Sequence, residues 1–202
     1  MTNMTELTLH HISVSDMDNN CYLIAAAGNG LLIDAADDAP ALLSMAEKAG
    51  VVITDVLTTH RHHDHVRALV EIIEATGATH WAPYLDAPAL PAQVDRELKD
   101  GDVLEFAGHS FPVHILRGHT PGGACLVAEL DGTVHLFVGD SLFPGGLGNT
   151  VGEGDFVRLY RDVTEKLFDV YPDDTVVHPG HGKSTTLGEQ RPHLDQWWKR
   201  RW

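Results

Sequence analysis

The stretch HRHHDH at positions 60–65 places four histidines and one aspartate within six residues. Neutral imidazole and carboxylate groups are ligands that suit zinc, iron and manganese. In an extended segment residues i and i+2 point to the same side, so we expect His60 and His62 to bind one metal ion side by side. His63 then points elsewhere. Asp64 and His65 lie where the chain turns into a predicted helix, and we expect them to face a second ion.

Three more candidate ligands follow downstream, each at the end of a β-like run and beside Gly or Pro. They are His119 in RGHTPGG, Asp140 in FVGDSLF and His181 in HPGHGKS. Each alone is a weak signal, because an Asp after a strand is usually a turn or cap residue and a His beside Gly is usually at the surface. Their recurrence in one setting favours a shared metal site. Glycine beside a ligand lets the backbone bend close to a metal without a side-chain clash.

The elements that must position the histidine cluster are a strand and a helix. We expect adjacent antiparallel strands at 7–14, 21–27 and 30–35, then a helix at 39–50, a short buried strand at 55–59 and a second helix at 66–77. Both helices end in Gly, as helices often do. The cluster therefore lies on a strand-to-helix loop, a common place for functional residues on a rigid scaffold.

The second half of the chain repeats this organisation without repeating the sequence. One hairpin is predicted over 101–116 and another over 124–140, the latter about an Asp131–Gly132 turn. An amphipathic helix is expected at 154–172, and a last strand in 174–182 leads into the His181 loop. Two β-rich halves, each with helices, predict an α+β fold in which two sheets pack face to face with helices outside. No linker is visible, so we expect one domain over residues 1–202.

The order of these motifs resembles that of a known family. The succession HxHxDH, GHTPG, GD and PGHG resembles the metallo-β-lactamase superfamily, and within it the glyoxalase II (hydroxyacylglutathione hydrolase) branch. The likeness runs from about His10 into TTLGEQ at 185–190. It implies a four-layer αββα sandwich with a dinuclear site at one edge of the sheets. It also implies the ligand sets, which are His60, His62 and His119 for the first ion, Asp64, His65 and His181 for the second, and Asp140 as the bridge.

The implied cofactor is a pair of Zn²⁺ ions, with iron or manganese as alternatives because His and Asp serve all three metals. Two cations that share one water would lower its pKa enough to give a bridging hydroxide near neutral pH. That hydroxide can attack the acyl carbon of a thioester or a related ester. Asp64 and Asp140 are the expected catalytic residues, because they can orient the attacking water. No side-chain nucleophile is needed, and neither Cys21 nor Cys125 lies in a ligand motif.

Three enzyme classes stay open for this site. A glyoxalase II-like thioester hydrolase leads. The second is a mononuclear iron enzyme resembling persulfide dioxygenases, which would use His60, His119 and Asp140, and the third is a lactonase. A non-catalytic metal-binding module is disfavoured, because all seven ligand positions are intact.

Two departures from the family pattern weigh against glutathione recognition. Where the glutathione-binding enzymes of the family generally carry a basic residue and, two positions later, an aromatic one, this chain has Asn149 and Val151. In addition, only 21 residues follow His181, where those enzymes carry a C-terminal helical region. A thioester hydrolase that acts on another thiol carrier, or on a broader set of acyl esters, fits both departures.

Bulk composition limits the partners. The 202 residues carry a formal net charge of −15, which argues against a nucleic-acid or anionic-membrane surface. No apolar run approaches the length of a membrane span, and the first residues do not read as a signal peptide. Two cysteines make no disulfide framework. We therefore expect a cytoplasmic enzyme that acts on a small acyl substrate, without a nucleic-acid or membrane partner.

Two features outside the motifs are expected to be structural. His178 is the closest of the remaining histidines to a ligand position, but its place on the last predicted strand favours packing. The tail HLDQWWKRRW at 193–202 is aromatic and basic. Because Trp side chains bury large areas, we expect the tail to pack over the core.

Overall fold

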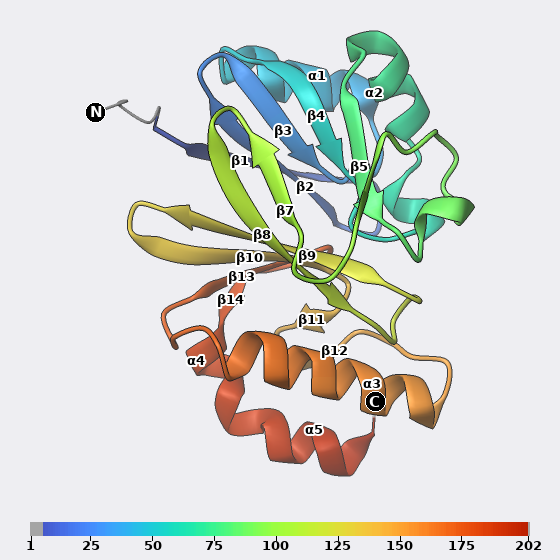
Figure 1. Ribbon diagram of the computed structural model, residues 1–202, viewed down its shortest axis with the longest axis vertical. Coiled ribbons are helices and arrows are strands. Elements are labelled where there is room, and N and C mark those ends of the chain that lie inside the picture. Colours follow the sequence, from blue (N-terminus) through green and yellow to red (C-terminus); the bar gives the residue numbers. More distant parts are fainter. Residues whose placement is uncertain (1–5, 202) are drawn as a thin grey trace.

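Residues 6–201 are described by the computed structural model, and they form two six-stranded sheets flanked by helices (Figure 1). The first sheet has the order β1-β2-β3-β4-β5-β6. Its strands are β1 (Thr8–Val14), β2 (Asn19–Ala26), β3 (Asn29–Ile33), β4 (Val52–Leu57), β5 (Thr79–Pro83) and β6 (Arg96–Leu98). The pairs β1–β2 and β2–β3 are antiparallel, as predicted, whereas the pairs from β3 to β6 are parallel.

The second sheet has the order β14-β13-β10-β9-β8-β7. Its strands are β7 (Val103–Phe106), β8 (His109–Leu116), β9 (Gly123–Leu130), β10 (Thr133–Gly139), β13 (Val176–Pro179) and β14 (Thr185–Thr186). All of its pairs are antiparallel except β10–β13. Asp131 and Gly132 both have positive φ at the β9–β10 turn, which confirms the predicted DG hairpin. β11 (Leu142–Phe143) and β12 (Gly146–Leu147) form a separate small hairpin.

Helices cover the outer face of each sheet. The first sheet carries α1 (Ala39–Lys48) and α2 (Leu69–Thr76). The second carries α3 (Glu153–Val163), with its π-helical continuation Thr164–Phe168, together with α4 (Leu187–Gln190) and α5 (Leu194–Arg200). Short 3₁₀ turns lie at His63–His65, Ala87–Ala89 and Arg191–His193. Helix, sheet, sheet and helix follow one another from the top to the bottom of Figure 1, so the predicted α+β αββα sandwich is confirmed.

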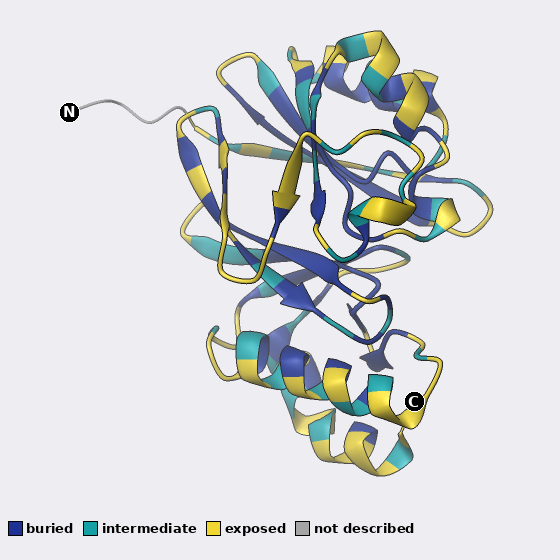
Figure 2. Cartoon of the chain, turned by 45° about the vertical axis from the view of Figure 1, so that its right-hand side comes forward, coloured by how far each residue is buried: buried dark blue, intermediate teal, exposed yellow. Residues whose placement is uncertain are grey.

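The core follows from the alternation of side chains along the strands. Every residue of β2 is buried, with Leu23 on the side of α1 and α2 and Ile24 on the side of the opposite sheet. A third apolar cluster lies between the second sheet and its helices, and it includes Phe156 and Trp197 (Figure 2). Trp197 is 1% exposed, so the tail packs on the core as predicted, although Trp198 stays 38% exposed. Trp202 lies outside the described residues.

Several elements differ from expectation, and the strand expected at 55–59 is β4, which spans Val52–Leu57. α2 begins at Leu69 rather than at 66, because His63–His65 form a separate 3₁₀ turn and Val66 leaves it with φ −135°. The α-helical hydrogen bonding of α3 ends at Val163, where the π turn follows. Strands β5 and β6 were not expected, because short strands of a parallel region lack a clear two-residue alternation.

Candidate metal centre

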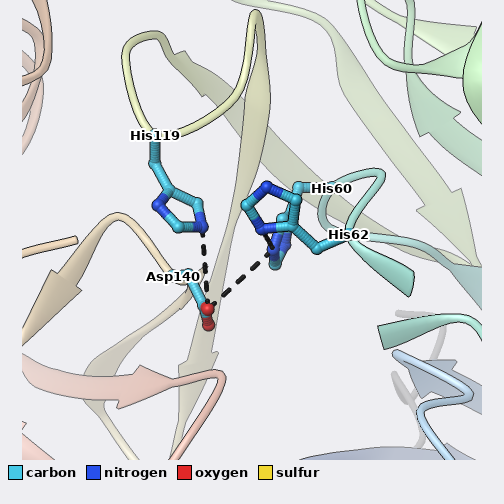
Figure 3. Close-up of side chains that lie close together, drawn as sticks. All are labelled: His60, His62, His119 and Asp140. Atoms are coloured by element: carbon cyan, nitrogen blue, oxygen red, sulfur yellow. Dashed lines mark hydrogen bonds and ion pairs between the residues drawn. The ribbon is translucent and has the colours of Figure 1, made fainter. Parts of the chain in front are cut away.

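All seven residues singled out from the sequence lie together at one edge of the two sheets. His60, His62, Asp64 and His65 follow β4, His119 lies between β8 and β9, Asp140 directly follows β10, and His181 follows β13. Four strand ends thus deliver the cluster from segments far apart in the chain. Figure 3 shows four of these side chains pointing toward one another. His63, in the same loop, is exposed and takes no part, as predicted.

The first group comprises His60, His62, His119 and Asp140. His60 Nε2 lies 3.2 Å from His62 Nδ1, and Asp140 Oδ2 lies 3.7 Å from His119 Nε2 and 3.9 Å from His60 Nε2. Two nitrogens bound to one tetrahedral zinc, at about 2.0–2.1 Å each, are about 3.4 Å apart. The spacing of this group is therefore that of a single ion's ligands.

The second group comprises Asp64, His65 and His181. His65 Nε2 lies 3.1 Å from His181 Nε2, and Asp64 Oδ2 lies 3.4 Å from the former and 3.2 Å from the latter. Asp140 also faces this group, with Oδ1 3.4 Å from His65 Nε2 and Oδ2 3.3 Å from His181 Nε2. Its carboxylate therefore lies between the two groups.

Two buried atoms of the cluster lack a hydrogen bond. Within the described part of the chain, neither His119 Nε2 nor Asp140 Oδ1 has a hydrogen-bond partner. Because buried polar atoms are almost always paired, such atoms need another kind of partner. A Cβ added at Gly180 would collide with the Asp140 carboxylate, so this glycine keeps the space beside the carboxylate open, and Gly148 allows close approach to the Asp140 backbone carbonyl. The donor set, the two orphan atoms and the open space fit a pair of divalent cations.

Backbone carbonyls fix the far sides of two of the imidazoles. His119 Nδ1 donates to the carbonyl of Asn149 at 2.7 Å, and His181 Nδ1 donates to the carbonyl of Met17 at 2.8 Å. With Nδ1 carrying the hydrogen, Nε2 is left free to face the centre. Such outer partners set the tautomer and the ring orientation of metal-binding histidines.

Asp34 holds one histidine of each group. This carboxylate is 2% exposed and accepts hydrogen bonds from His65 Nδ1 at 2.9 Å and from the Thr59 hydroxyl at 2.7 Å. The Thr59 oxygen in turn accepts from His60 Nδ1 at 3.0 Å. Sequence reasoning missed Asp34. The available signal was its place at the end of the run GLLID, the same setting as Asp140.

A second buried carboxylate ties two ligand loops together. Asp86 is fully buried and accepts hydrogen bonds from the backbone N–H of Arg61 at 3.0 Å and of Gly122 at 3.2 Å. Arg61 lies between His60 and His62, and Gly122 belongs to the loop that carries His119. Asp86 therefore fixes the separation of the two loops of the first group.

Two asparagines fix the loops that carry the second group, as Asp86 does for the first. Asn19 Nδ2 donates to Asp64 Oδ2 at 2.9 Å. Asn20 Nδ2 donates to the carbonyls of Pro179 and Gly182, both at 2.9 Å, on either side of the His181 loop. The start of β2 therefore anchors the last ligand loop.

The histidines of the two groups have pKa values shifted in opposite directions. Burial lowers the pKa of His60 and of His62, so both imidazoles are neutral and ready to bind a metal. Burial also acts to lower the pKa of His65, but the carboxylates of Asp140 and Asp34 outweigh it and raise the value to about 10. The hydrogen bond to Asp140 raises the pKa of His181. A cation entering the second group therefore displaces protons.

His178 and the two thiols lie outside this chemistry. The His178 ring stacks on Phe137 with centroids 4.8 Å apart, and its Nε2 lies 2.9 Å from His135 Nδ1. Burial lowers its pKa to about 3, so it packs as a neutral ring, as predicted. Cys21 and Cys125 are buried and unpaired, and burial raises the pKa of Cys21 to about 12. Neither thiol can serve as a nucleophile.

A cleft of about 670 Å³ opens over the cluster. It is lined by Met17, His62, Asp64, His119, Asp140, Phe143, Leu147, Gly148, Asn149, Thr150, Val151 and His181. The loop after β12 and the turn before β2 form its walls. A substrate in this cleft would meet the candidate ligands directly.

Across residues 6–201, no helix is long and apolar enough to cross a membrane.

Comparison with known proteins agrees with this geometry. The model of the metallo-beta-lactamase superfamily matches residues 14–181. A hydroxyacylglutathione hydrolase of Polaromonas sp. strain JS666 is 41% identical over 79% of this chain, which spans only 60% of that relative. A hydroxyacylglutathione hydrolase GloC of Haemophilus influenzae is 30% identical over 92% of this chain and 95% of its own length. The structure of TTHA1623 in a di-iron-bound form superposes with a TM-score of 0.74 at 29% identity, over 90% of this chain and 96% of that one.

Proposed function

The chain belongs to the metallo-β-lactamase superfamily, and we propose that it is a dinuclear-metal hydrolase of thioesters or related acyl esters. One observation carries the proposal. The Asp140 carboxylate lies 3.3 Å from His181 Nε2 and 3.7 Å from His119 Nε2, between two intact groups of candidate ligands. The relatives named hydroxyacylglutathione hydrolase support a thioester as the substrate class, and the Haemophilus relative supports it over nearly the full length of both chains.

The proposed ligand roles follow the two groups. His60, His62 and His119 would hold the first cation, Asp64, His65 and His181 would hold the second, and Asp140, which faces both groups, would serve both. We propose zinc, because neutral imidazole and carboxylate oxygen suit it. Iron is the main alternative, supported by the di-iron form of the 29% identical TTHA1623.

When bound, two such cations lower the pKa of water toward neutrality and polarise an acyl oxygen. The chain's own residues supply orientation. Asp64 and Asp140 face the centre from opposite loops, so their carboxylate oxygens can accept hydrogen bonds from an attacking water and hold it toward the acyl carbon. Asp34, through His65 and Thr59, keeps the imidazoles in one orientation. No side-chain nucleophile takes part, because both thiols are buried and protonated.

The intact second group favours hydrolysis over the iron dioxygenase alternative. A single iron needs only His60, His119 and Asp140, whereas Asp64, His65 and His181 also converge here within hydrogen-bonding range of one another. An open site with two histidines and one carboxylate is the typical centre of non-haem iron oxygenases. These three residues give the dinuclear hydrolase the second group of ligands that it requires.

We also propose the size of the substrate, the domain organisation and the cellular location. The substrate is a small molecule that fits a cleft of about 670 Å³. Residues 1–202 act as one domain, which is supported by the apolar cluster that both sheets share. Two buried unpaired thiols and a net charge of −15 support a cytoplasmic enzyme without a nucleic-acid partner.

The test is metal content followed by turnover. Protein purified without added metal should contain about two equivalents of zinc or iron per chain, and it should release thiol from acyl thioesters faster than from lactones or β-lactams. One iron per chain together with oxygen consumption on a persulfide would replace the hydrolase with the dioxygenase. Full loading with two metals but no turnover on thioesters, esters or lactones would refute an acyl hydrolase.

A further inference from the structure

Among the residues that the structure describes, no cationic side chain other than histidine lines the cleft over the candidate metal centre. Of its twelve lining residues, none is Lys or Arg. The residues that are not candidate ligands are all uncharged, and four of them have sizeable apolar side chains. A substrate group that carries a carboxylate would therefore find no fixed positive partner in the cleft apart from the metal centre.

The apolar residues lie around the mouth of the cleft. Met17 is 49% exposed and Val151 is 98% exposed, which is unusual for an aliphatic side chain. Phe143 and Leu147, from the β11–β12 hairpin, continue this lining toward the ligands. The Phe143 ring lies 6.4 Å from the His181 ring, centroid to centroid. An apolar rim thus runs from the solvent to the second group.

Acidic residues flank the rim, and Arg67, whose Nη2 lies 3.8 Å from Met17 Sδ, is paired through Nη1 with Asp37 at 3.1 Å. Asp16 and Asp18 are exposed and flank Met17, and Glu153 is exposed two residues after Val151. The whole chain carries a formal charge of −15. This field disfavours an anionic ligand over a neutral one of the same size.

Arg201 is the cation of the adjoining hollow, and it is already engaged. It lines that hollow with the loop at 149–153, and its guanidinium carbon lies 3.6 Å from the centre of the Trp198 ring. It does not line the cleft over the ligands. The stacked position on Trp198 stabilises the guanidinium away from the centre.

We propose that the group attached through the scissile bond is a neutral carrier without carboxylates, seated on the rim of Met17, Phe143, Leu147 and Val151. This inference rests on the proposed acyl hydrolase and names its substrate class. The carrier is thus distinct from glutathione itself, whose two carboxylates would meet an apolar and acidic rim. Shape and burial of an apolar carrier then supply the binding that a basic residue would supply for an anionic one.

The test compares two thioesters that differ only in charge. S-acetyl-N-acetylglutathione carries two carboxylates, and its dimethyl ester carries none. With the two-metal enzyme, thiol release should show a kcat/KM at least fivefold higher for the dimethyl ester, mainly through KM. A smaller difference, or a preference for the free acid, would overturn the neutral carrier while leaving the acyl hydrolase intact. Failure of both thioesters, with metal fully loaded, would refute the proposed function and this inference together.

Two lysine variants show whether the rim is responsible. Val151→Lys places a cation at the exposed rim, so it should improve the free acid relative to the dimethyl ester by at least threefold. Val170→Lys adds the same charge at a 57% exposed position outside the cleft and should leave the ratio unchanged. Equal shifts in both variants would mean that overall charge, rather than the rim, sets the preference, and would overturn the assignment.

A third variant examines the competing cation. Arg201→Gln should leave the ratio of the two thioesters as it is in the unmodified enzyme. A selective loss on the free acid alone would show that Arg201 receives a carboxylate of the carrier, which would overturn the neutral carrier.

Discussion

Asp34 accepts a hydrogen bond from Nδ1 of His65 at 2.9 Å, deep in the core and on the far side of the imidazole from the candidate metal centre. The same carboxylate also accepts from the Thr59 hydroxyl, which holds His60. One buried residue thereby orients a ligand of each group. This link gives the two groups a common support, because the orientation of a ring in each group depends on Asp34.

Asp34→Asn should weaken metal binding at both groups by about 10–100-fold, the range typical of partners that orient metal-binding histidines. The amide can donate as well as accept, so it no longer holds His65 Nδ1–H and the Thr59 hydroxyl together. Competition with a chromophoric chelator would measure both affinities. Asp37→Asn, three residues along the chain and paired at the surface with Arg67, is the matched control and should bind metal normally. Unchanged affinity in the Asp34 variant would contradict the shared support.

Asp140→Asn should lower kcat/KM for thioesters by more than a hundredfold, because a direct ligand contributes more than its orienting partners. The amide keeps the shape of the carboxylate but loses the charge that faces both groups. Metal content should fall below two equivalents in the same protein. His63→Ala, in the same loop as the ligands but exposed, should retain both activity and metal. An active two-metal Asp140→Asn enzyme would remove Asp140 from the centre.

Asp86→Ala should loosen the first group selectively. Removing the carboxylate leaves the N–H groups of Arg61 and Gly122 unpaired in the interior, at a cost of about 1–3 kcal/mol of stability. We expect the first cation to bind at least about tenfold more weakly and the second to be little affected. A stepwise metal titration followed by calorimetry resolves the two events. Asp86→Asn, which can still accept one N–H, should bind the first cation more tightly than Asp86→Ala does. If Asp86 only stabilised the fold, Asp86→Ala would lower the metal affinity of both groups equally.

His178 should make the fold sensitive to acid. Its folded pKa of about 3 lies below the ordinary histidine value of 6.5, so the unfolded chain binds more protons below pH 6.5 and stability falls as the pH drops toward 3. Between pH 7 and pH 5 this amounts to about 2 kcal/mol. Urea unfolding in a chelator, which removes the effect of metal loss, should show this slope in the wild type and a smaller slope in His178→Gln. The exposed His193→Gln is the control. Equal slopes in all three proteins would show that His178 does not cause the acid sensitivity.

The sequence by itself determined the candidate ligands and the layers that carry them. Local spacing was enough for His60 and His62, since alternate residues of an extended loop share a side, and the observed separation of 3.2 Å agrees. The two-residue alternation of strands such as β7 and the Gly-terminated helices predicted the layered fold, because these patterns depend only on which face of an element is buried. The DG turn at Asp131 was equally local.

The tertiary structure alone decided the rest. Asp34 and Asp86 each look like a turn residue in the sequence, and only the meeting of loops from different strands gives them their hydrogen bonds. The parallel pairing from β3 to β6 was likewise invisible, because the direction of pairing depends on which segments meet in the fold and not on the pattern within one strand. The absence of a cation from the cleft also emerged only in three dimensions, since its lining is drawn from segments between Met17 and His181. The sequence specifies the chemical groups and the local elements that carry them, whereas long-range packing decides which of these groups lie in contact.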